Sequence, residues 1–498
     1  MTTSQRSERP QLTDAAADTR DNEIADSTAL GRQIRTGLGW SFLNNVLGRA
    51  GTLIAGIVLA RLLDPQDYGV FAVALVAMNL LMSLNDAGMT AAVVRWPGRV
   101  DDIAPTAATL ILAFSIALYA ILWVAAPPFA AAFGVPEATG ILRLLAVTII
   151  IDGLFALPTA LLTRSFLQGR RTTADLANLV VSSVIAILLA KQGYGAWSLA
   201  WGRLAGNMVS GLVIVALAPR RPRPGFRVET ARNLLAYGLP LTGSSLLVFA
   251  MLNVDTVIVG RLLGPVSLGF YVLAFNLSSW PVNMFSFAVR RVSLAGFARI
   301  ADDRARLRAA YLRSLALLLA VSLPVCVLLA TLSLPTIRFV YGDKWAEASV
   351  PLHWLALLGV VRVATELTYD LILAIGRPRA VFRLQLLWVI ALIPALALGA
   401  RIGGIGEVAA GHLLVGLLIV LPAFGYELRH VEIRMGDIAR ALARPAVAAL
   451  IAVVTSIIVM TLVDTSFLQL IAAGAAGLIA YAVVVAPMRR LIHAPLAS

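Results

Sequence analysis

The stretch Arg61-Leu-Leu-Asp-Pro-Gln-Asp-Tyr-Gly69 has a second copy 200 residues further on, Arg261-Leu-Leu-Gly-Pro-Val-Ser-Leu-Gly269. Both copies fit the pattern Arg-Leu-Leu-x-Pro-x-x-x-Gly, and each joins two long apolar segments. A string of this length repeated between matching apolar flanks indicates an internal duplication. Duplicated membrane bundles are the usual construction of secondary transporters, in which the substrate site lies between the repeats. The sequence therefore predicts two related bundles around a central cavity.

The composition is that of a membrane protein. Of the 498 residues, 59% are apolar and 14% are charged, and the mean hydropathy is +0.85, whereas soluble domains carry about 25% charged residues. Apolar runs of roughly 18 residues or more predict membrane-spanning helices. We expect fourteen spans, although the pairs within 104–162 and 381–426 divide less cleanly and leave twelve or thirteen as alternatives. The predicted spans are about 38–60, 69–93, 104–126, 138–162, 173–190, 196–218, 237–260, 269–289, 310–334, 350–374, 381–400, 406–426, 446–463 and 467–487.

The fold class that follows is an all-α polytopic membrane protein with two parallel-repeat six-helix bundles and two further C-terminal helices. The repeat continues beyond its first string, since Leu142-Arg-Leu-Leu-Ala146 matches Leu352-His-Trp-Leu-Ala356. Six spans per unit is an even number, so both units enter the membrane from the same side and the repeat is parallel. The expected boundaries are a disordered cytoplasmic tail at 1–36, an N-terminal bundle at 37–219, a basic cytoplasmic linker at 220–235, a C-terminal bundle at 236–430, a cytoplasmic loop with two accessory helices at 431–488 and a cytoplasmic tail at 489–498.

The formal net charge of +14 follows the topology and does not indicate nucleic-acid binding. With the amino terminus inside, 31 of the 41 Lys and Arg residues fall in predicted inside regions, 6 in outside loops and 4 within spans. This bias is the positive-inside rule, and it predicts a multi-pass protein of the bacterial cytoplasmic (inner) membrane with both termini in the cytoplasm. One cysteine and four scattered histidines give no metal-ligand spacing. We expect no metal, no cofactor and no nucleic-acid partner.

Two matching polar stripes mark the predicted cavity. The stripe of the second span recurs at i, i+4, i+7 and i+11, which is one helical face: Asn79, Ser83, Asp86 and Thr90. The stripe of the eighth span stands at the same positions plus 200: Ser279, Asn283, Ser286 and Arg290. Polar groups in a membrane interior usually face a bundle interior or a watery cavity. We therefore expect both stripes to line one cavity, and the alternative is hydrogen bonding that only holds the bundle together.

The first span is the most polar, and it contains Asn45, Arg49 and Thr52 on one face. Arg49 lies near its middle, too far from either interface for its side chain to snorkel. An unpaired arginine there is costly, so a cavity, a carboxylate such as Asp86 or an anionic ligand should lie near it. The predicted cavity residues are therefore Asn45, Arg49, Asn79, Ser83, Asp86, Asn253, Asn283 and Arg290.

Ionisable residues also occur in the seventh and tenth spans. In the seventh, Asn253 and Thr256 share a face, while Asp255 points elsewhere. Asp255 is a candidate for ion or proton coupling, and structural pairing with an arginine is the alternative. In the tenth, Arg362 and Glu366 stand at i and i+4, a spacing that predicts an ion pair. None of these residues forms a catalytic pattern.

Several strings at turns and helix ends carry a family resemblance. They are Gly39-Trp-Ser41, Leu59-Ala-Arg-Leu-Leu-Asp-Pro-Gln-Asp-Tyr-Gly69, Asp86-Ala-Gly88, Asn253-Val-Asp255, Gly260-Arg-Leu-Leu-Gly264, Gly269-Phe-Tyr271 and Tyr341-Gly-Asp-Lys-Trp345. Together they resemble the polysaccharide-transporter family, the Wzx-type oligosaccharide flippases and polysaccharide exporters of the multidrug, oligosaccharidyl-lipid and polysaccharide exporter superfamily. The resemblance covers about residues 37–430.

The resemblance implies two six-helix lobes around a cavity that opens alternately to each side of the membrane. It implies a cavity lined by the first, second, seventh and eighth spans, and a polyprenyl-pyrophosphate-linked oligosaccharide as cargo, a precursor of polysaccharide, capsule or lipopolysaccharide. Members of the family often have cationic cavities that hold the pyrophosphate, and Arg49 and Arg290 occupy suitable places. A polysaccharide polymerase and glycosyltransferases are candidate partners beside the lipid bilayer.

Two other functions are weighed against this one. A multidrug or organic-cation antiporter of the same superfamily would place buried carboxylates in its cavity, and Arg49 at mid-span argues against it. A membrane glycosyl polymerase or ligase generally needs a sizeable outside loop for its acceptor and catalytic groups. Every predicted outside loop is short, so we expect a transporter and not an enzyme.

Overall fold

The computed structural model describes residues 48, 50–85, 89–95, 100–165, 167–218 and 225–488, and within these ranges all regular structure is helical. Twelve of the described helices are long and apolar enough to cross a membrane, and the shorter apolar helix Ala50–Leu62 precedes them. The all-α polytopic fold is thus confirmed. The α-helices are α2 (Pro65–Asn85), α3 (Met89–Arg95), α4 (Ala104–Ala132), α5 (Ala138–Arg164), α6 (Gln168–Lys191), α7 (Ala196–Leu217), α8 (Val228–Arg299), α9 (Arg304–Thr331), α10 (Ser333–Tyr341), α11 (Ser349–Ala374), α12 (Pro378–Ile402), α13 (Ile405–Val415), α14 (Leu421–Leu428), α15 (Met435–Thr461), α16 (Ser466–Leu468) and α17 (Gly474–Val485).

The second copy of the repeated string lies at a sharp bend in α8. Gly264 has φ 83° and ψ 178°, a backbone conformation that favours glycine because a Cβ would clash there. The bend divides α8 into arms at 228–263 and 265–299, which correspond to the predicted seventh and eighth spans. The first arm begins at Val228, inside the stretch expected to be a linker. The first copy likewise joins two helices, Ala50–Leu62 and α2.

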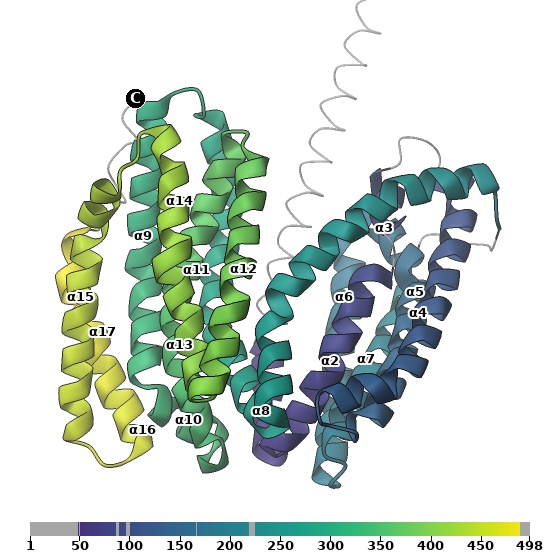
Figure 1. Ribbon diagram of the computed structural model, residues 1–498, viewed down its shortest axis with the longest axis horizontal. Coiled ribbons are helices and arrows are strands. Elements are labelled where there is room, and N and C mark those ends of the chain that lie inside the picture. Colours follow the sequence, from purple (N-terminus) through teal and green to yellow (C-terminus); the bar gives the residue numbers. More distant parts are fainter. Residues whose placement is uncertain are drawn as a thin grey trace, which may run out of the picture.

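The helices form two groups that α8 connects (Figure 1). We call the helix Ala50–Leu62 with α2–α7 the N-lobe, and the second arm of α8 with α9–α14 the C-lobe. The start of α8 is fastened to the N-lobe, because Thr106 Oγ1 of α4 accepts from Arg227 N at 3.1 Å and Leu234 packs against Ala92 and Leu157. Beyond the bend, α8 packs in the C-lobe, where Val282 shares a core with Tyr311 of α9 and Leu367 of α11.

The lobes touch at one end, which we call the joined end and define by residues 60–69, 264–271 and 339–345. Gly69 lies directly against the carbonyl of Pro265, and Gly269 lies in the same way against the carbonyl of Pro65. A Cβ on either glycine would overlap with the facing oxygen. The two copies of the string therefore meet each other reciprocally. Figure 1 shows the two groups of helices diverging away from this end.

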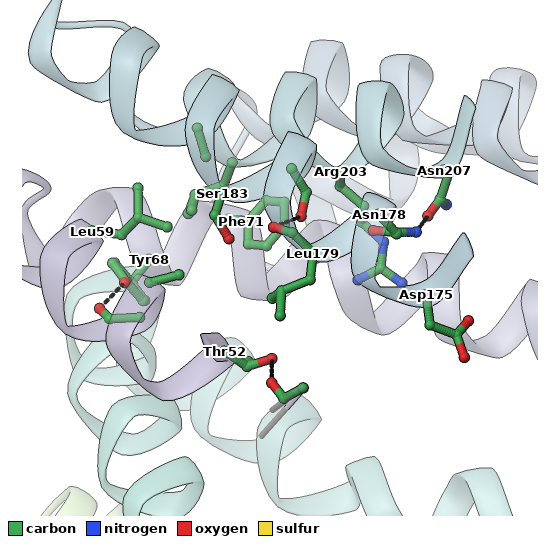
Figure 2. A pocket seen from close by; sticks show the side chains of 16 residues that line it. Thr52, Leu59, Tyr68, Phe71, Asp175, Asn178, Leu179, Ser183, Arg203 and Asn207 are labelled. Carbon is green, nitrogen blue, oxygen red and sulfur yellow. Dashed lines mark hydrogen bonds between the residues drawn. The ribbon is translucent and has the colours of Figure 1, made fainter. Parts of the chain in front are cut away.

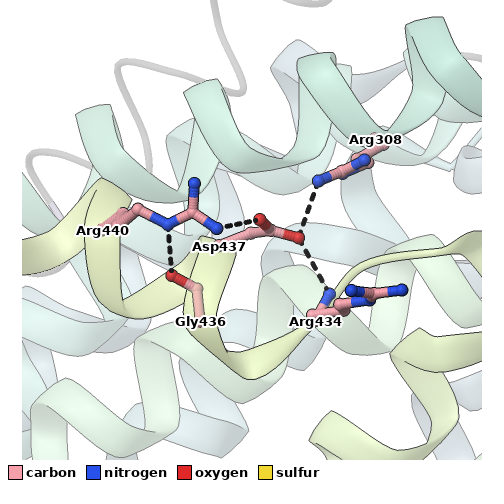
Figure 3. A network of polar contacts seen from close by, with 5 residues as sticks. All are labelled: Arg308, Arg434, Gly436, Asp437 and Arg440. Carbon is pink, nitrogen blue, oxygen red and sulfur yellow. Dashed lines mark hydrogen bonds and ion pairs between the residues drawn. The ribbon is translucent and has the colours of Figure 1, made fainter.

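The last helices form an accessory pair, α15 with α16 and α17, on the outer flank of the C-lobe (Figure 1). Asp437 fixes the start of α15 (Figure 3): its Oδ2 accepts from Arg308 Nη2 of α9 at 2.8 Å and its Oδ1 from Arg440 Nη2 at 3.1 Å. The same carboxylate accepts from the backbone N of Arg434 at 3.1 Å, which closes a cap on the helix. Further along, the Tyr481 hydroxyl donates to the carbonyl of Ala320. The pair is thus held to α9 at two depths.

The reciprocal contact gives the first prediction. Gly69→Ala or Gly269→Ala should push the lobes apart at the joined end, because the new methyl group meets a backbone oxygen that cannot rotate away. Gly296→Ala in α8 is the matched control, since a Cβ there meets nothing within 4 Å and alanine favours the helix by about 1 kcal/mol.

The measurement is a spin-label distance between cysteines introduced at Lys191 and Asp343, with Cys326→Ser to remove the native thiol. The two motif variants should shift the distance distribution to longer values, and the control should keep the wild-type distribution. Identical distributions in all proteins would show that the joined end does not depend on this close approach.

Candidate functional site

Polar contacts reinforce the joined end, and the first copy of the string supplies most of them. Trp345 Nε1 donates to the carbonyl of Ala60 at 2.7 Å, and the Trp345 ring meets the edges of Tyr68 and Phe270. Arg61 donates from Nε to the carbonyl of Val340 at 2.9 Å and from Nη2 to that of Phe339 at 2.6 Å. These carbonyls belong to the last turn of α10, where a helix lacks internal donors. The string is therefore an interlobe fastening.

The predicted stripes are only partly visible. Asn79 and Asn283 are exposed on α2 and α8, and Ser83 is half-buried with its hydroxyl donating to the carbonyl of Leu80. Ser279 is buried. Asn45, Arg49 and Asp86 lie outside the described residues, as does the side chain of Arg290. The common cavity expected from the stripes stays a prediction.

Asp255 is buried, with 3% of its surface exposed. Its Oδ1 accepts from the backbone N of Thr256 at 2.8 Å, and its Oδ2 accepts from the Tyr271 hydroxyl at 3.2 Å. Tyr271 lies on the other arm of α8, so this hydrogen bond bridges the bend at Gly264. The hydrogen-bond partner of Asp255 on the other arm is thus a tyrosine, and the charge of Asp255 also acts on Arg362. Coupling by Asp255 and structural pairing with an arginine both stay predictions. Asn253 only donates to the carbonyl of Phe249 in its own helix.

The charge of Glu366 acts on that of Arg362, as the i, i+4 spacing predicts, although the two side chains form no direct ion pair within the described residues. Arg362 instead donates from Nη1 to Ser279 Oγ at 3.1 Å and lies 5.6 Å from the centre of the Phe275 ring. Helical spacing brings two side chains near each other but does not exclude a competing acceptor on a neighbouring helix. Within the described residues, Glu366 Oε2 and His412 Nδ1 are buried without a hydrogen-bond partner. The described part of the C-lobe interior therefore contains two polar atoms whose hydrogen-bonding capacity is unused, and whether His412 Nδ1 donates or accepts depends on the tautomer.

A polar pocket of about 710 Å³ lies inside the N-lobe, between the helix Ala50–Leu62, α6 and α7 (Figure 2). Its polar lining includes Thr52, Tyr68, Asn178, Ser182, Arg203 and Asn207. Asn178 Nδ2 donates to Asn207 Oδ1 at 2.9 Å across the two helices. Figure 2 shows the Arg203 guanidinium projecting from α7 beside Asn178.

This pocket and a second buried polar group do not follow from the repeat pattern of the sequence. Arg203 stands in the middle of an apolar span, the same signal that singled out Arg49, but it has no polar counterpart in the other repeat. The second group is in α2, α4 and α5, where Asn85 donates to Asp152 Oδ2 at 3.0 Å and accepts from Ser115 Oγ at 2.8 Å. Both groups connect helices of a single lobe. A comparison of the two repeats does not reveal them, because it selects only residues that occur in both.

The comparisons with known proteins place the chain among polysaccharide biosynthesis proteins. A family model described as "Polysaccharide biosynthesis protein" matches residues 58–350. The succinoglycan biosynthesis transport protein ExoT of Rhizobium meliloti is 27% identical over 388 residues, which cover 76% of this chain and 77% of the relative. The lipopolysaccharide biosynthesis protein WzxC of Escherichia coli is 24% identical over 400 residues, covering 78% of this chain and 80% of the relative.

Solved structures agree with the fold. The lipid II flippase MurJ in an inward closed conformation superposes with a TM-score of 0.74 at 17% identity, covering 92% of this chain and all of that one. An inward-facing multidrug resistance transporter of the MATE family superposes with a TM-score of 0.59 at 18% identity, covering 77% of this chain and 94% of that one. At these identities the likeness establishes the fold alone. The resemblance drawn from the motifs is confirmed.

The bridge across the bend of α8 gives the second prediction. Tyr271→Phe removes the donor to Asp255 and leaves a buried carboxylate oxygen unsatisfied, so it should lower the stability of the purified protein by roughly 1–3 kcal/mol. Tyr311→Phe is the matched control, because the buried Tyr311 hydroxyl bonds only the neutral hydroxyl of Thr368 and its loss should cost about 1 kcal/mol.

The measurement is the thermal unfolding midpoint in detergent micelles. Tyr271→Phe should lower the midpoint more than Tyr311→Phe, and Asp255→Asn added to Tyr271→Phe should restore part of the loss. Equal midpoints for the two single variants would refute a bridging role for Asp255.

Proposed function

The chain belongs to the polysaccharide biosynthesis protein family, and on that premise we propose that it moves a lipid-linked oligosaccharide across the cytoplasmic membrane. The observation that carries the proposal is the match of the family model over 58–350, together with one relative named as a succinoglycan biosynthesis transport protein and another named as a lipopolysaccharide biosynthesis protein. The cargo would be a polyprenyl-pyrophosphate-linked precursor of polysaccharide, capsule or lipopolysaccharide. The protein is a transporter and not an enzyme.

The physical task explains the architecture. A sugar chain and a pyrophosphate cannot cross hydrocarbon unaided, since their polar groups find no partners there. Two lobes joined at one end can enclose the polar headgroup while the prenyl tail stays in lipid. With the positive-inside orientation, the joined end faces outward and the diverging end faces the cytoplasm. This arrangement would be the loading state, and export would require the joined end to part.

The alternatives are less well supported. The MATE-type fold is shared with multidrug transporters, but the family model and the curated relatives favour an oligosaccharide cargo over an organic cation. A glycosyl polymerase would be an enzyme, and the relatives and structural neighbours are named as transporters or flippases. A polymerase and glycosyltransferases remain proposed partners that would use or supply the cargo.

We assign the cargo headgroup to the cavity residues predicted from the sequence. Arg49 is the first of them, because it is a permanent cation whose fork of donors suits a pyrophosphate. Asn45, Asn79, Ser83, Asn253 and Asn283 would bind sugar hydroxyls, with Asp86 and Arg290 beside them. The exposure of Asn79 and Asn283 on helices of different lobes supports this assignment.

We assign ion or proton coupling to Asp255. It is buried on the first arm of α8, and its charge acts on Arg362 of α11. The charge of Arg362 also acts on Glu366 and His412, each of which has a buried polar atom without a hydrogen-bond partner in the described part of the chain. A bound proton or small cation would complete such a group. Because Asp255 bonds to Tyr271 across the bend of α8, a change in its charge would act on the helix that connects the lobes.

Orientation is tested by labelling. We expect the Arg220–Arg232 linker and both termini in the cytoplasm and the Tyr341–Trp345 turn outside, as the distribution of Lys and Arg predicts. Single cysteines at these sites, in a Cys326→Ser background, are exposed to an impermeant thiol reagent on intact cells. Only the turn should react, and labelling of the linker but not the turn would invert the orientation.

Cargo binding is tested at Arg49. Arg49→Lys should impair polymer export and Arg49→Ala should impair it more, because lysine keeps the charge but loses the bidentate geometry. The competing explanation is that Arg49 only neutralises Asp86. Arg49→Ala combined with Asp86→Ala should then recover export, whereas a cargo-binding Arg49 leaves the double variant inactive. Export and membrane protein level are both measured. Full export by a normally expressed Arg49→Ala protein would show that Arg49 does not bind the cargo.

A further inference from the structure

The N-lobe pocket contains an arginine without a counterpart. Arg203 lies near the middle of α7, half-buried, and its Nε is buried without a hydrogen-bond partner among the described residues. Other membrane arginines find acceptors: Arg362 bonds Ser279, and Arg143 donates to the carbonyl of Trp123 while stacking on its ring. Within the described ranges, Arg203 forms no hydrogen bond and no ion pair.

An arginine in this position needs an anion. Charged side chains inside a membrane protein pair with each other or mark a substrate or ion pathway. The pocket does contain one carboxylate, Asp175, about one helical turn from Asn178 on α6, but Asp175 is exposed, has an interaction of its own, and forms no ion pair with Arg203. The protein therefore leaves the charge of Arg203 to be neutralised from the pocket.

The hydrogen-bond donors around the pocket favour an oxyanion over a cation or a neutral sugar. The hydroxyl protons of Thr52, Tyr68 and Ser182 are used on the backbone carbonyls of Gly48, Gly56 and Leu179. The Asn178 amide is used on Asn207, whose own Nδ2 remains a donor. Arg203 and Asn207 stand at i and i+4, on one face of α7. Among the described residues, the donors left free in the lining are thus the Arg203 guanidinium, the Asn207 amide and the Ser183 hydroxyl of α6.

The volume fits a ligand group. About 710 Å³ lies within the range of roughly 300–1,000 Å³ that ligand pockets occupy, and a phosphoryl group with part of an attached sugar would fit. A guanidinium binds phosphate with two parallel hydrogen bonds. The pocket is built by helices of one lobe, and it shares the first span, through Thr52, and α2, through Tyr68 and Phe71, with the predicted cavity. Arg203 and Asn207 of α7 distinguish it from the residues predicted for that cavity.

We propose that the pocket of Arg203, Asn178 and Asn207 is a phosphoryl-binding site within the N-lobe. Its ligand is a phosphate or pyrophosphate group, whether carried by the polyprenyl cargo or free in solution. The assignment of the cargo as the source of this phosphoryl group rests on the proposed function. The assignment of an oxyanion site does not. In the cargo form, Arg203 would hold the headgroup during the passage that begins at the central cavity.

The first experiment titrates the purified full-length protein in lipid nanodiscs with inorganic pyrophosphate and follows the thermal unfolding midpoint. The wild type should be stabilised, and Arg203→Gln should weaken the apparent affinity at least tenfold. Arg203→Lys should fall between them. Arg143→Gln is the matched control, since it removes a membrane arginine outside the pocket, and it should titrate as the wild type. The series is repeated with Arg49→Gln present in every protein, so that binding at the central cavity is removed from the comparison.

A second variant keeps the test valid if Arg203→Gln fails to fold. Asn207→Asp places a carboxylate one turn from Arg203 and supplies the missing counter-charge. It should raise the midpoint without ligand and abolish the response to pyrophosphate. Wild-type affinity in either Arg203→Gln or Asn207→Asp would overturn the site.

A third arm separates the two sources of the phosphoryl group. Nanodiscs doped with undecaprenyl pyrophosphate are compared with nanodiscs doped with undecaprenol. If the first but not the second weakens binding of inorganic pyrophosphate in an Arg203-dependent manner, the cargo is the ligand. Without that competition, the site binds a free anion and the cargo assignment is overturned. Polymer export by the wild type is scored separately: its absence beside intact Arg203-dependent binding would overturn the proposed function and uphold the site.

Discussion

The close approach of two glycines to two proline carbonyls is the constraint on which the arrangement of the lobes depends. Gly69 and Gly269 have no side chains, so each turn can lie against the backbone of the other. Because contact is made at the ends of long helices, a small rotation there becomes a large displacement at the far ends, at about 1.5 Å of helix per residue. The duplicated string is thus the pivot of the molecule, and Trp345 and Arg61 fasten it by hydrogen bonds to backbone carbonyls. Backbone carbonyls are suitable acceptors for these hydrogen bonds because they are present whichever side chains surround them.

Polar groups inside the lobes divide into two kinds according to whether the protein satisfies them. Asn85 with Ser115 and Asp152, and Ser293 with Asp370 at 2.6 Å, hold helices of one lobe together. Such bonds contribute modestly in membranes, about 0.6 kcal/mol on average. Arg203 and Glu366 differ because atoms of each are buried without partners. A polar group with its hydrogen-bond partners inside the protein explains how the helices pack. A buried polar group without a partner destabilises the ligand-free protein and becomes favourable only when a ligand supplies the partner. We therefore assign function to these groups.

The sequence predicted the fold class well, because the length of an apolar helix follows from the thickness of the membrane. The count of fourteen spans stays a prediction, beside the twelve long apolar helices of the described residues. The sequence also predicted that the string at 61–69 and its copy at 261–269 would join helices, but not that the two copies would touch, since no local pattern encodes a contact between lobes. Helical spacing placed Arg362 near Glu366 and missed Ser279, which lies on another helix and accepts the hydrogen bond. Arg203 was overlooked for a related reason. Features shared by both repeats do not include Arg203, because no polar residue stands at the matching position of the second repeat.

The bend of α8 connects these observations. Its two arms are packed in different lobes, and Gly264 supplies the backbone freedom to change the angle between them. The Asp255–Tyr271 hydrogen bond crosses that bend and is buried, so its strength depends on whether the carboxylate is charged: an ionised acceptor makes roughly twice as strong a bond as a neutral one. A proton or cation arriving at Asp255 would therefore weaken the restraint on the bend directly. In the proposed cycle, neutralisation of the Asp255 carboxylate would itself release α8, the helix about which the joined end turns. No conformational change elsewhere in the fold would be needed to link the two events.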